Sequence, residues 1–525
     1  MNNLGFWHFA HNNPAATALI APEATAPRRV SRGELLAESN RLSHALRDLG
    51  LTSGDAVAIA APNSVESFEL YLATIQIGLY LVPVNWHLAA PEIEYILRDS
   101  GARVFIAHEK LKTTAINATT DSANAGRQCH CFAIGDIPGF GSYHRLKSGQ
   151  PATAPPERRA GQVMNYTSGT TGRPKAVKRA LPDLSPDLLY SIMPSMLGNT
   201  FNIGPEDGHV HYCGSPLYHT AVTSWAGNSL HLGHCVVVVD KWDAAQMLAD
   251  IERFAVTTSH MVPTQFTRLL KLPDTRRRQH KLGSLRSIIH AAAPCPPAVK
   301  QAMLDWWGPI IYEYYAGTEG GSAICTPQDW LKYPGTVGKA PPSSGLRILD
   351  DEGADLPPNS PGSVYLKIMD GMDFEYKGDA EKTRANRKGD YFTLGDIGYL
   401  NEEGFLFLSD RKIDMIISGG ANIYPAEVEN VLIMHPAVLD CAVFGIPNDD
   451  WGEEVKAVVQ LCADATADDA LQAELQHFLQ ERLAKMKLPR SYDFVTELPR
   501  DPNGKLYKRR LRGCLLAGPR TGRLI

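Results

Sequence analysis

The chain has 525 residues, a length that predicts two or more domains rather than one compact core. Its composition, 44% hydrophobic and 21% charged, is that of a globular protein and excludes a disordered chain. The net charge of −5 excludes a general basic field for nucleic acid. Scattered cysteines without a CxxC pair, and the lack of a signal-peptide pattern, predict a soluble cytoplasmic protein without a transmembrane segment.

Strand and helix patterns alternate along two stretches of the chain. The first is expected to hold a strand at 56–62, a helix at 64–78 capped by Ser64 and stopped by Gly78, a strand at 79–85, a helix at 90–101 and a strand at 102–108. The second is expected to hold strands at 234–240, 257–263, 285–294 and 309–317 around helices at 243–255, 264–271 and 296–307. Such alternation is typical of βαβ units, so we predict an α/β fold with two doubly wound subdomains.

The pattern changes twice further along. From about residue 337, short alternating segments separated by Gly, Pro and Asp turns predict a small, barrel-like antiparallel β subdomain. After Asp410 a compact α+β pattern follows, with helices at 425–435 and 468–483 and strands at 439–447, 453–461 and 491–499. We therefore predict a large N-terminal domain, 1–409, and a small C-terminal domain, 410–525. The basic run Lys508–Arg512 is expected to be a solvated face.

One loop indicates phosphate binding. In NYTSGTTGRPKAVKR, 165–179, two glycines permit close backbone approach, and hydroxyls and lysines supply donors and charge. The spacing is not that of a P-loop, because Arg173 rather than Lys follows Gly172. A flexible linker is the alternative; that reading suits the Pro-rich stretch 148–159 but not the apolar lead-in to this loop. The candidate phosphate contacts are Thr167, Ser168, Gly169, Thr170, Thr171, Gly172 and Lys175.

This loop resembles the signature loop of the adenylate-forming superfamily, which includes acyl-CoA synthetases, peptide-synthetase adenylation domains and luciferases. Five further motifs resemble those of the superfamily in order: PLYHTA (216–221), YEYYAGTEG (312–320), YFTLGDIGYL (391–400), LSDRKIDMIISGGANIYPAEVE (408–429) and PRDPNGKLYKRRL (499–511). The resemblance spans residues 165 to 511 and is nearest to fatty-acid or aryl acyl-CoA ligases.

The resemblance implies a two-step reaction with ATP, Mg²⁺ and CoA. A carboxylate attacks the α-phosphate of ATP to give acyl-AMP, and the CoA thiol then attacks the acyl carbon. It implies Lys505 as the catalytic cation, Glu319 and Thr170 as Mg²⁺ and phosphate contacts, and a mobile C-terminal domain that acts as a lid. The implied nucleotide contacts, besides the loop and Lys505, are Ala292, Ala293, Pro294, Tyr315, Thr318, Asp396 and Arg411.

The same resemblance assigns the other substrates. His219, His260, Ala316 and Gly317 are implied to line the acid pocket, and Gly419, Gly420 and Trp451 to meet CoA. Ala316 stands where relatives usually carry Gly, and Ile413 where many carry a charged hinge residue. The mostly apolar pocket segments favour a hydrophobic carboxylic acid, with aryl acids of the coumarate or benzoate type as the alternative. A stand-alone adenylating enzyme and a luciferase-like oxygenase stay open, as does a homodimer.

Overall fold

The structure, a computed structural model, describes residues 4–22, 26–120, 129–167, 174–205, 208–342, 344–369, 371–411, 413–500, 506, 508 and 511–512. The chain forms two compact units. The first comprises Met1–His260, His280–Ile288 and Asp370–Ala385, and the second Met261–Gln279, Ile289–Met369 and Asn386–Ile525. The boundary predicted at residue 410 falls inside the second unit and remains a prediction.

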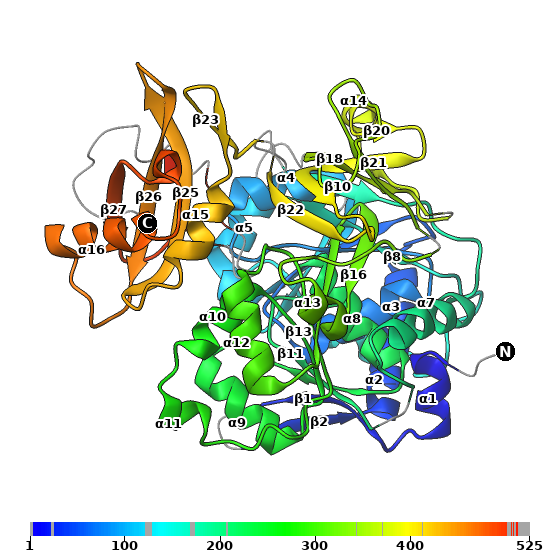
Figure 1. The fold of residues 1–525 in the computed structure, drawn as a ribbon. Coiled ribbons are helices and arrows are strands. Elements are labelled where there is room, and N and C mark those ends of the chain that lie inside the picture. The colour runs from blue at the N-terminus through cyan, green and yellow to red at the C-terminus, as the bar shows by residue number, and fades with distance from the viewer. Residues whose placement is uncertain are drawn as a thin grey trace. The chain divides into compact units, whose positions relative to one another are not determined.

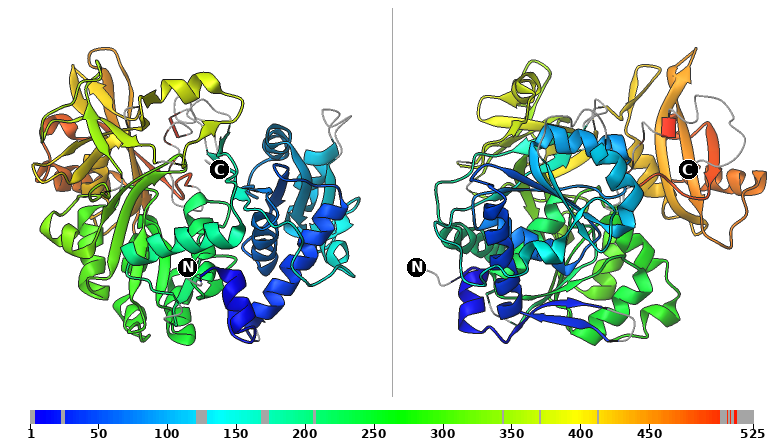
Figure 2. Two further views of the ribbon diagram at one scale, coloured as in Figure 1. Left: turned by 90° about the vertical axis from the view of Figure 1, so that its right-hand side faces the viewer. Right: turned by 180° about the vertical axis from the view of Figure 1, so that it is seen from behind.

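The first unit contains a parallel sheet of six strands with helices on both faces. The strand order is β7 (Gly141–Ser142), β6 (His130–Ile134), β5 (Ala102–His108), β3 (Ala56–Ala60), β4 (Tyr80–Pro83) and β8 (Gln162–Val163). Side chains of a strand alternate between faces, so Val57 and Ile59 of β3 pack with α2 (Arg32–Asp48) and α3 (Val65–Ile75). Ala58 and Ala60 pack on the other face with α4 (Ala90–Ser100) and α5 (Lys112–Thr120). Helices cover both faces of this sheet (Figure 2).

A second sheet with strands in the first unit includes the strand of His260, one residue of the predicted acid pocket. Its strands lie in the order β13 (Thr258–Met261), β11 (Val210–Cys213), β12 (Cys235–Val238), β1 (Thr17–Ala21) and β2 (Arg28–Ser31), parallel except for β2 (Figure 1). The helices of this part are α1 (Phe6–Asn12), α7 (Pro186–Thr200), α8 (Thr220–His231) and α9 (Ala244–Phe254). A small sheet joins β19 (Glu375–Tyr376), β10 (Lys175–Lys178) and β9 (Asn165–Thr167).

The second unit begins with the helices α10 (Pro263–Leu270) and α12 (Pro297–Trp307). Strand β14 (Ser287–His290) starts in the first unit, and its last two residues belong to the second. The antiparallel pair β15 (Ile311–Gly317) and β16 (Gly320–Cys325) follows. The predicted antiparallel module is confirmed as a five-stranded sheet: β17 (Leu346–Leu349), β18 (Gly362–Lys367), β21 (Tyr391–Leu400), β20 (Arg387–Lys388) and β22 (Leu406–Arg411).

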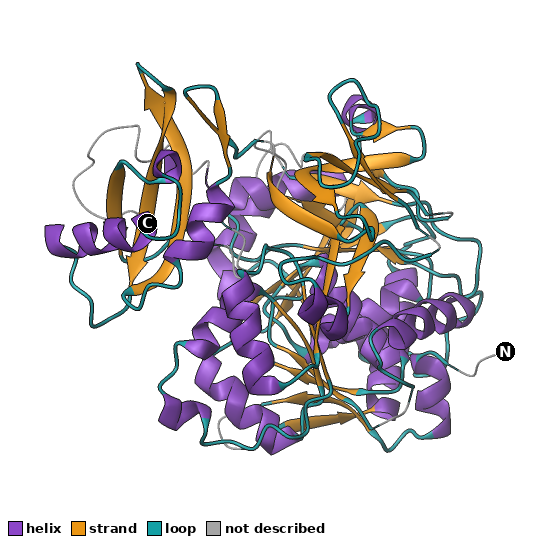
Figure 3. Cartoon of the chain, viewed as in Figure 1, coloured by secondary structure: helices purple, strands orange, loops and turns teal. Residues whose placement is uncertain are grey.

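The predicted α+β pattern after residue 410 is also present (Figure 3). Strands β25 (Val438–Asn448) and β26 (Gly452–Leu461) pair in antiparallel fashion, and β27 (Ser491–Val495) lies parallel to β26. The hairpin of β23 (Ile416–Ser418) and β24 (Ala421–Ile423) completes the sheet. Leucines and valines of α15 (Pro425–Leu432) and α16 (Asp469–Gln480) share one core with it.

The α/β prediction is therefore confirmed, with two local differences. Ser64 does precede α3, but its side chain makes no capping hydrogen bond to the backbone. The strand predicted at 285–294 ends at His290, because Ala292 takes a positive φ of 74° that an extended strand does not allow. No helix within the described ranges is long and apolar enough to cross a membrane.

Candidate functional site

Two strands of the first unit hold the ends of the predicted phosphate loop. Thr167 at the end of β9 stands opposite Lys175 at the start of β10 in the antiparallel register. Ser168, Gly169, Thr170, Thr171 and Gly172 lie outside the described residues. The Lys175 ammonium pairs with the Asp379 carboxylate, and this hydrogen bond lowers the pKa of Asp379. Asp379, which the sequence analysis did not identify, therefore holds the cation beside the loop.

In the second unit, Asp396 lies between two of the residues predicted to contact nucleotide. The Tyr315 hydroxyl donates a 2.6 Å hydrogen bond to Asp396 Oδ2. Arg411 stands opposite Asp396 in the register of β21 and β22, with its Nε 3.7 Å from Asp396 Oδ1. Burial and then the Asp396 charge raise the pKa of Tyr315, so its hydroxyl keeps its proton and remains a donor. Tyr315 and Arg411 lie more than 90 positions apart in the chain, yet they form one polar cluster with Asp396.

The end of β15 explains why residue 317 is glycine. A Cβ atom there would lie 2.4 Å from Leu394 Cδ2 and 2.7 Å from Glu319 Oε2, so both side chains would have to move to admit it. The Glu319 carboxylate therefore folds back over Gly317. Ala316 and Thr318 are the chain neighbours of Gly317. Ala316 is partly exposed at this strand end.

The Glu319 carboxylate suits a magnesium ion chemically. Mg²⁺ takes hard oxygen ligands and is commonly held by one or two carboxylates together with substrate phosphates. Among the described residues, no group of three or more His, Cys, Asp or Glu side chains is placed to hold a metal. These residues therefore fit a Mg²⁺ site in which one carboxylate and the oxygens of the substrate phosphates coordinate the ion. Thr170, the other predicted contact, lies outside the described residues.

The predicted nucleotide turn follows β14 directly. Ala292 has φ 74°, the left-handed region that costs a residue with a Cβ roughly 1–2 kcal/mol. Ala292 and Pro294 are exposed and Ala293 is half-buried, so the backbone of this turn is open to a ligand. Strained backbone of this kind persists where surrounding contacts fix it.

The two histidines of the predicted acid pocket belong to the first unit. His219 is the N-cap residue of α8, and His260 lies in β13 and is buried. The His260 ring stacks against Trp225 of α8 with ring centroids 6.5 Å apart, and Phe201 meets Trp225 edge-on at 4.8 Å. Bulky aromatic rings thus occupy the space beside His260.

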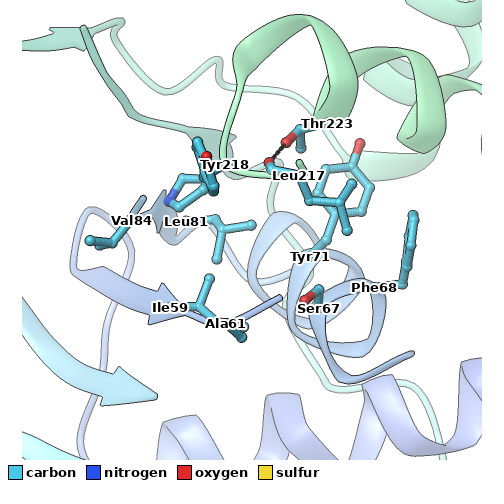
Figure 4. A pocket seen from close by; sticks show the side chains of 11 residues that line it. Ile59, Ala61, Ser67, Phe68, Tyr71, Leu81, Val84, Leu217, Tyr218 and Thr223 are labelled. Atoms are coloured by element: carbon cyan, nitrogen blue, oxygen red, sulfur yellow. Dashed lines mark hydrogen bonds between the residues drawn. The ribbon is translucent and has the colours of Figure 1, made fainter. Parts of the chain in front are cut away.

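A small cavity lies behind the segment that precedes His219 (Figure 4). Its walls come from β3, α3, β4 and the start of α8, and Thr223 donates a hydrogen bond to the Leu217 carbonyl at its edge. Its volume of about 30 Å³ holds one or two water molecules. It is too small for a carboxylic acid substrate.

The three predicted CoA contacts lie together in the second unit. The Gly419 N–H donates a 2.8 Å hydrogen bond to the Trp451 carbonyl. Gly419 and Gly420 have φ values of 57° and 80°, which glycine adopts without strain. The Trp451 ring is about half exposed, with the Arg490 guanidinium 5.0 Å from its centroid. An exposed indole beside a cation and open backbone suits a flat or extended polar ligand.

Lys505 lies outside the described residues, whereas Arg500, Leu506 and Lys508 are described. Arg500 donates to both carboxylate oxygens of Asp440, at 2.5 and 2.8 Å, and forms a bridge with Leu506. The expectation that the basic run from Lys508 is solvated is wrong for Lys508 itself. Its side chain is only 12% exposed and pairs with Glu429 at 2.8 Å; burial opposes the charged form, but Glu429 and the other nearby carboxylates raise its pKa.

A buried charge cluster behind the strand ends was not predicted. Lys300 of α12 donates to Glu313 of β15 at 2.5 Å, and His290 Nε2 lies 3.4 Å from the same carboxylate oxygen. A sequence signal existed, because Glu313 interrupts an otherwise apolar and aromatic strand, IIYEYYAG.

The fold and these clusters define an adenylate-forming enzyme, and comparison with known proteins agrees. The chain matches the AMP-binding enzyme family over residues 6–371 and the AMP-binding enzyme C-terminal domain over 427–505. It belongs to the AMP-binding enzyme family.

Relatives match over nearly their full length. The chain is 32% identical over 510 residues to the fatty acid–acyl-carrier-protein ligase ScoC of Streptomyces coeruleorubidus, covering 96% of this chain and 94% of the relative. It is 30% identical to the long-chain-fatty-acid–CoA ligase FadD13 of Mycobacterium tuberculosis, covering 98% of each. The crystal structure of the anthranilate CoA ligase AuaEII with anthranoyl-AMP has a TM-score of 0.84 at 28% identity, covering 98% of this chain and 99% of that one. The prediction of an enzyme of this family is thus confirmed.

Proposed function

We propose that the protein activates a hydrophobic carboxylic acid with ATP, as acyl-AMP, and transfers the acyl group to the thiol of CoA. The cluster of Tyr315, Asp396 and Arg411 carries this proposal. One carboxylate can accept two hydrogen bonds from the vicinal hydroxyls of a ribose, and Asp396, held by a tyrosine hydroxyl and facing an arginine, is oriented for that task.

Different parts of the chain would neutralise the charges of the phosphates and of the attacking acid. Lys175, held by Asp379, would support the phosphates that leave as pyrophosphate. Lys505 would neutralise the two anions, carboxylate and α-phosphate, that approach each other in the first step. Glu319 would hold the Mg²⁺ ion, which when bound supplies positive charge to the phosphate oxygens.

The acid itself is proposed only as a class. Relatives are named for fatty acids and for anthranilate, so both an aliphatic and an aryl acid are represented among similar chains. The aromatic rings of Phe201 and Trp225 beside His260 favour a hydrophobic acid over a charged one. The acceptor has one alternative: a carrier-protein thiol, as the name of ScoC states for that relative.

The proposal is tested by pyrophosphate release over a panel of fatty, cinnamic, benzoic and amino acids, with CoA, with a carrier protein bearing its phosphopantetheine, or with neither thiol. We expect release only with hydrophobic acids, and turnover beyond one equivalent only with the accepted thiol.

Lys505→Ala should lower acyl-AMP formation by about 10²-fold or more, while thioester formation from supplied acyl-AMP continues. Acid-independent ATP hydrolysis, or equal loss of both steps in Lys505→Ala, would contradict the proposal. Oxygen uptake during turnover would instead indicate a luciferase-like enzyme.

A further inference from the structure

Three charged or titratable side chains meet in the interior of the second unit, where ordinary packing would place apolar groups. Lys300 and His290 are fully buried and Glu313 is 5% exposed. Lys300 Nζ lies 2.5 Å from Glu313 Oε2, and His290 Nε2 lies 3.4 Å from the same oxygen. Within the described part of the chain, neither ring nitrogen of His290 has a partner in hydrogen-bond geometry.

Aromatic rings seal this group from solvent. The Lys300 ammonium lies 5.4 Å from the centroid of the Trp330 ring, and Phe266 meets His290 edge-on at 5.2 Å. The Lys300 charge, acting against burial, lowers the pKa of Glu313 to about 2, so the carboxylate stays ionised. Burial is costly for such groups, and apolar residues of similar volume are often as stabilising, so stability alone does not account for them.

The position of the group along the chain suggests what it does. Each of its members sits on a different element: Lys300 on α12, His290 at the last position of β14 and Glu313 on β15. Two residues beyond His290 comes Ala292, with its strained φ of 74°. Two residues beyond Glu313 comes Tyr315, on the same face of the strand, which donates to Asp396.

We propose that Lys300, Glu313 and His290 are positioning residues for the nucleotide: they fix the ends of β14 and β15, and thereby place the turn at Ala292 and the Tyr315 hydroxyl. The bond from Lys300 to Glu313 holds β15 against α12, and His290 at the end of β14 lies beside the same Glu313 oxygen, so the ends of both strands are fixed next to one another. A contact of this kind over-determines strained backbone, as the turn at Ala292 requires. The inference rests on the proposed function, since it assigns these strand ends to ATP.

The test distinguishes a role of the three residues in positioning the nucleotide contacts from a role in the stability of the fold. In Lys300→Met/Glu313→Leu, apolar side chains of similar size replace the ion pair, so we expect a Tm close to that of the wild type. Because the strand ends lose their common tether, we expect KM for ATP to rise roughly tenfold to hundredfold, while KM for the acid changes by less than about twofold. Pyrophosphate release measures both constants, and calorimetry with AMP measures nucleotide affinity directly.

A matched control exists in the first unit. Lys147 Nζ lies 2.5 Å from Glu69 Oε2, and both side chains are buried. Lys147→Met/Glu69→Leu makes the same exchange at two residues that are not among the predicted nucleotide contacts, so KM for ATP and AMP affinity should stay at wild-type values. An equal rise in this control would overturn the proposal.

A conservative variant keeps the test decisive if the double variant does not fold. Glu313→Asp retains the charge but shortens the side chain by one methylene, and should raise KM for ATP with little change in Tm. Wild-type KM for ATP in either folded variant would overturn the proposal. If the wild type releases no pyrophosphate with any acid, the proposed function fails instead, and AMP binding still decides whether the cluster positions a nucleotide.

Discussion

At the scale of single residues, the candidate site depends on a few polar atoms with defined partners. Asp396 receives the Tyr315 hydroxyl on one oxygen, and Arg411 stands near the other. A hydrogen bond to a charged group contributes about 1.5–3 kcal/mol, more than one between neutral groups. Tyr315 therefore does more than offer a ring for stacking: it fixes the direction of the carboxylate.

Tyr315→Phe should consequently weaken ATP binding while the fold persists. The ring and its packing remain, but Asp396 loses its donor and rotates more freely, so we expect KM for ATP to rise about tenfold. Steady-state kinetics with varied ATP measure the effect. Tyr399→Phe is the matched control on β21, the strand that carries Asp396; there the Tyr399 ring stacks on Phe407 at 5.1 Å. Equal KM values for the two variants would contradict the role given to the Tyr315 hydroxyl.

At the scale of elements, hairpins present backbone where side chains would obstruct a ligand. The β23–β24 turn carries Gly419 and Gly420, both with positive φ, and Trp451 packs against the first of them. A Cβ at Gly419 would lie 2.6 Å from the Trp451 ring, whereas nothing lies within 4 Å of a Cβ at Gly420. The two positions share the same backbone requirement and differ only in their neighbour.

That difference gives a paired prediction for the thiol step. Gly419→Ala should displace the Trp451 ring and lower the rate of CoA acylation from supplied acyl-AMP, by about tenfold if Trp451 meets CoA. Gly420→Ala carries the same conformational strain without the collision, and should affect that rate much less. Acyl-AMP formation should be unchanged in both. Similar rates of CoA acylation in the two variants would exclude Trp451 as a CoA contact.

At the scale of the whole molecule, buried histidines couple stability to pH. His231, the last residue of α8, accepts a hydrogen bond from the Phe6 N–H on Nδ1 at 3.2 Å and is fully buried. Burial lowers its pKa from 6.5 to about 3, so the folded state keeps it neutral. The unfolded chain binds a proton near pH 6.5, and stability is therefore complete above that pH and lost as the pH falls toward 3.

The expected loss from His231 is about 1.4 kcal/mol of unfolding free energy at pH 5.5. Urea unfolding at pH 7.5 and 5.5 measures it, and His231→Gln should reduce the difference between the two pH values by this amount. His477 is 74% exposed, so His477→Gln should leave the difference unchanged. An unaltered pH dependence in His231→Gln would show that the unfolded and folded states hold this proton equally.

The sequence predicted the elements well and the contacts between distant residues poorly. Periodicity placed the strands and helices at 56–108 and 234–317, since buried parallel strands and amphipathic helices impose it locally. The strand predicted at 285–294 extends four residues beyond the end of β14, because nothing in the sequence HAAAP indicates the positive φ of Ala292. Asp379 was not predicted as a site residue, because no local sequence pattern distinguishes a carboxylate that pairs with Lys175 from one in solvent.

By itself, the sequence determined the α/β class and, through its ordered motifs, the family. Only the tertiary structure decided that Tyr315 and Arg411 share Asp396, that Lys508 pairs with Glu429, and that Lys300, Glu313 and His290 meet in the interior. The physical reason is that secondary structure follows from neighbours in the chain, whereas burial and ion pairing depend on which distant segments fold together.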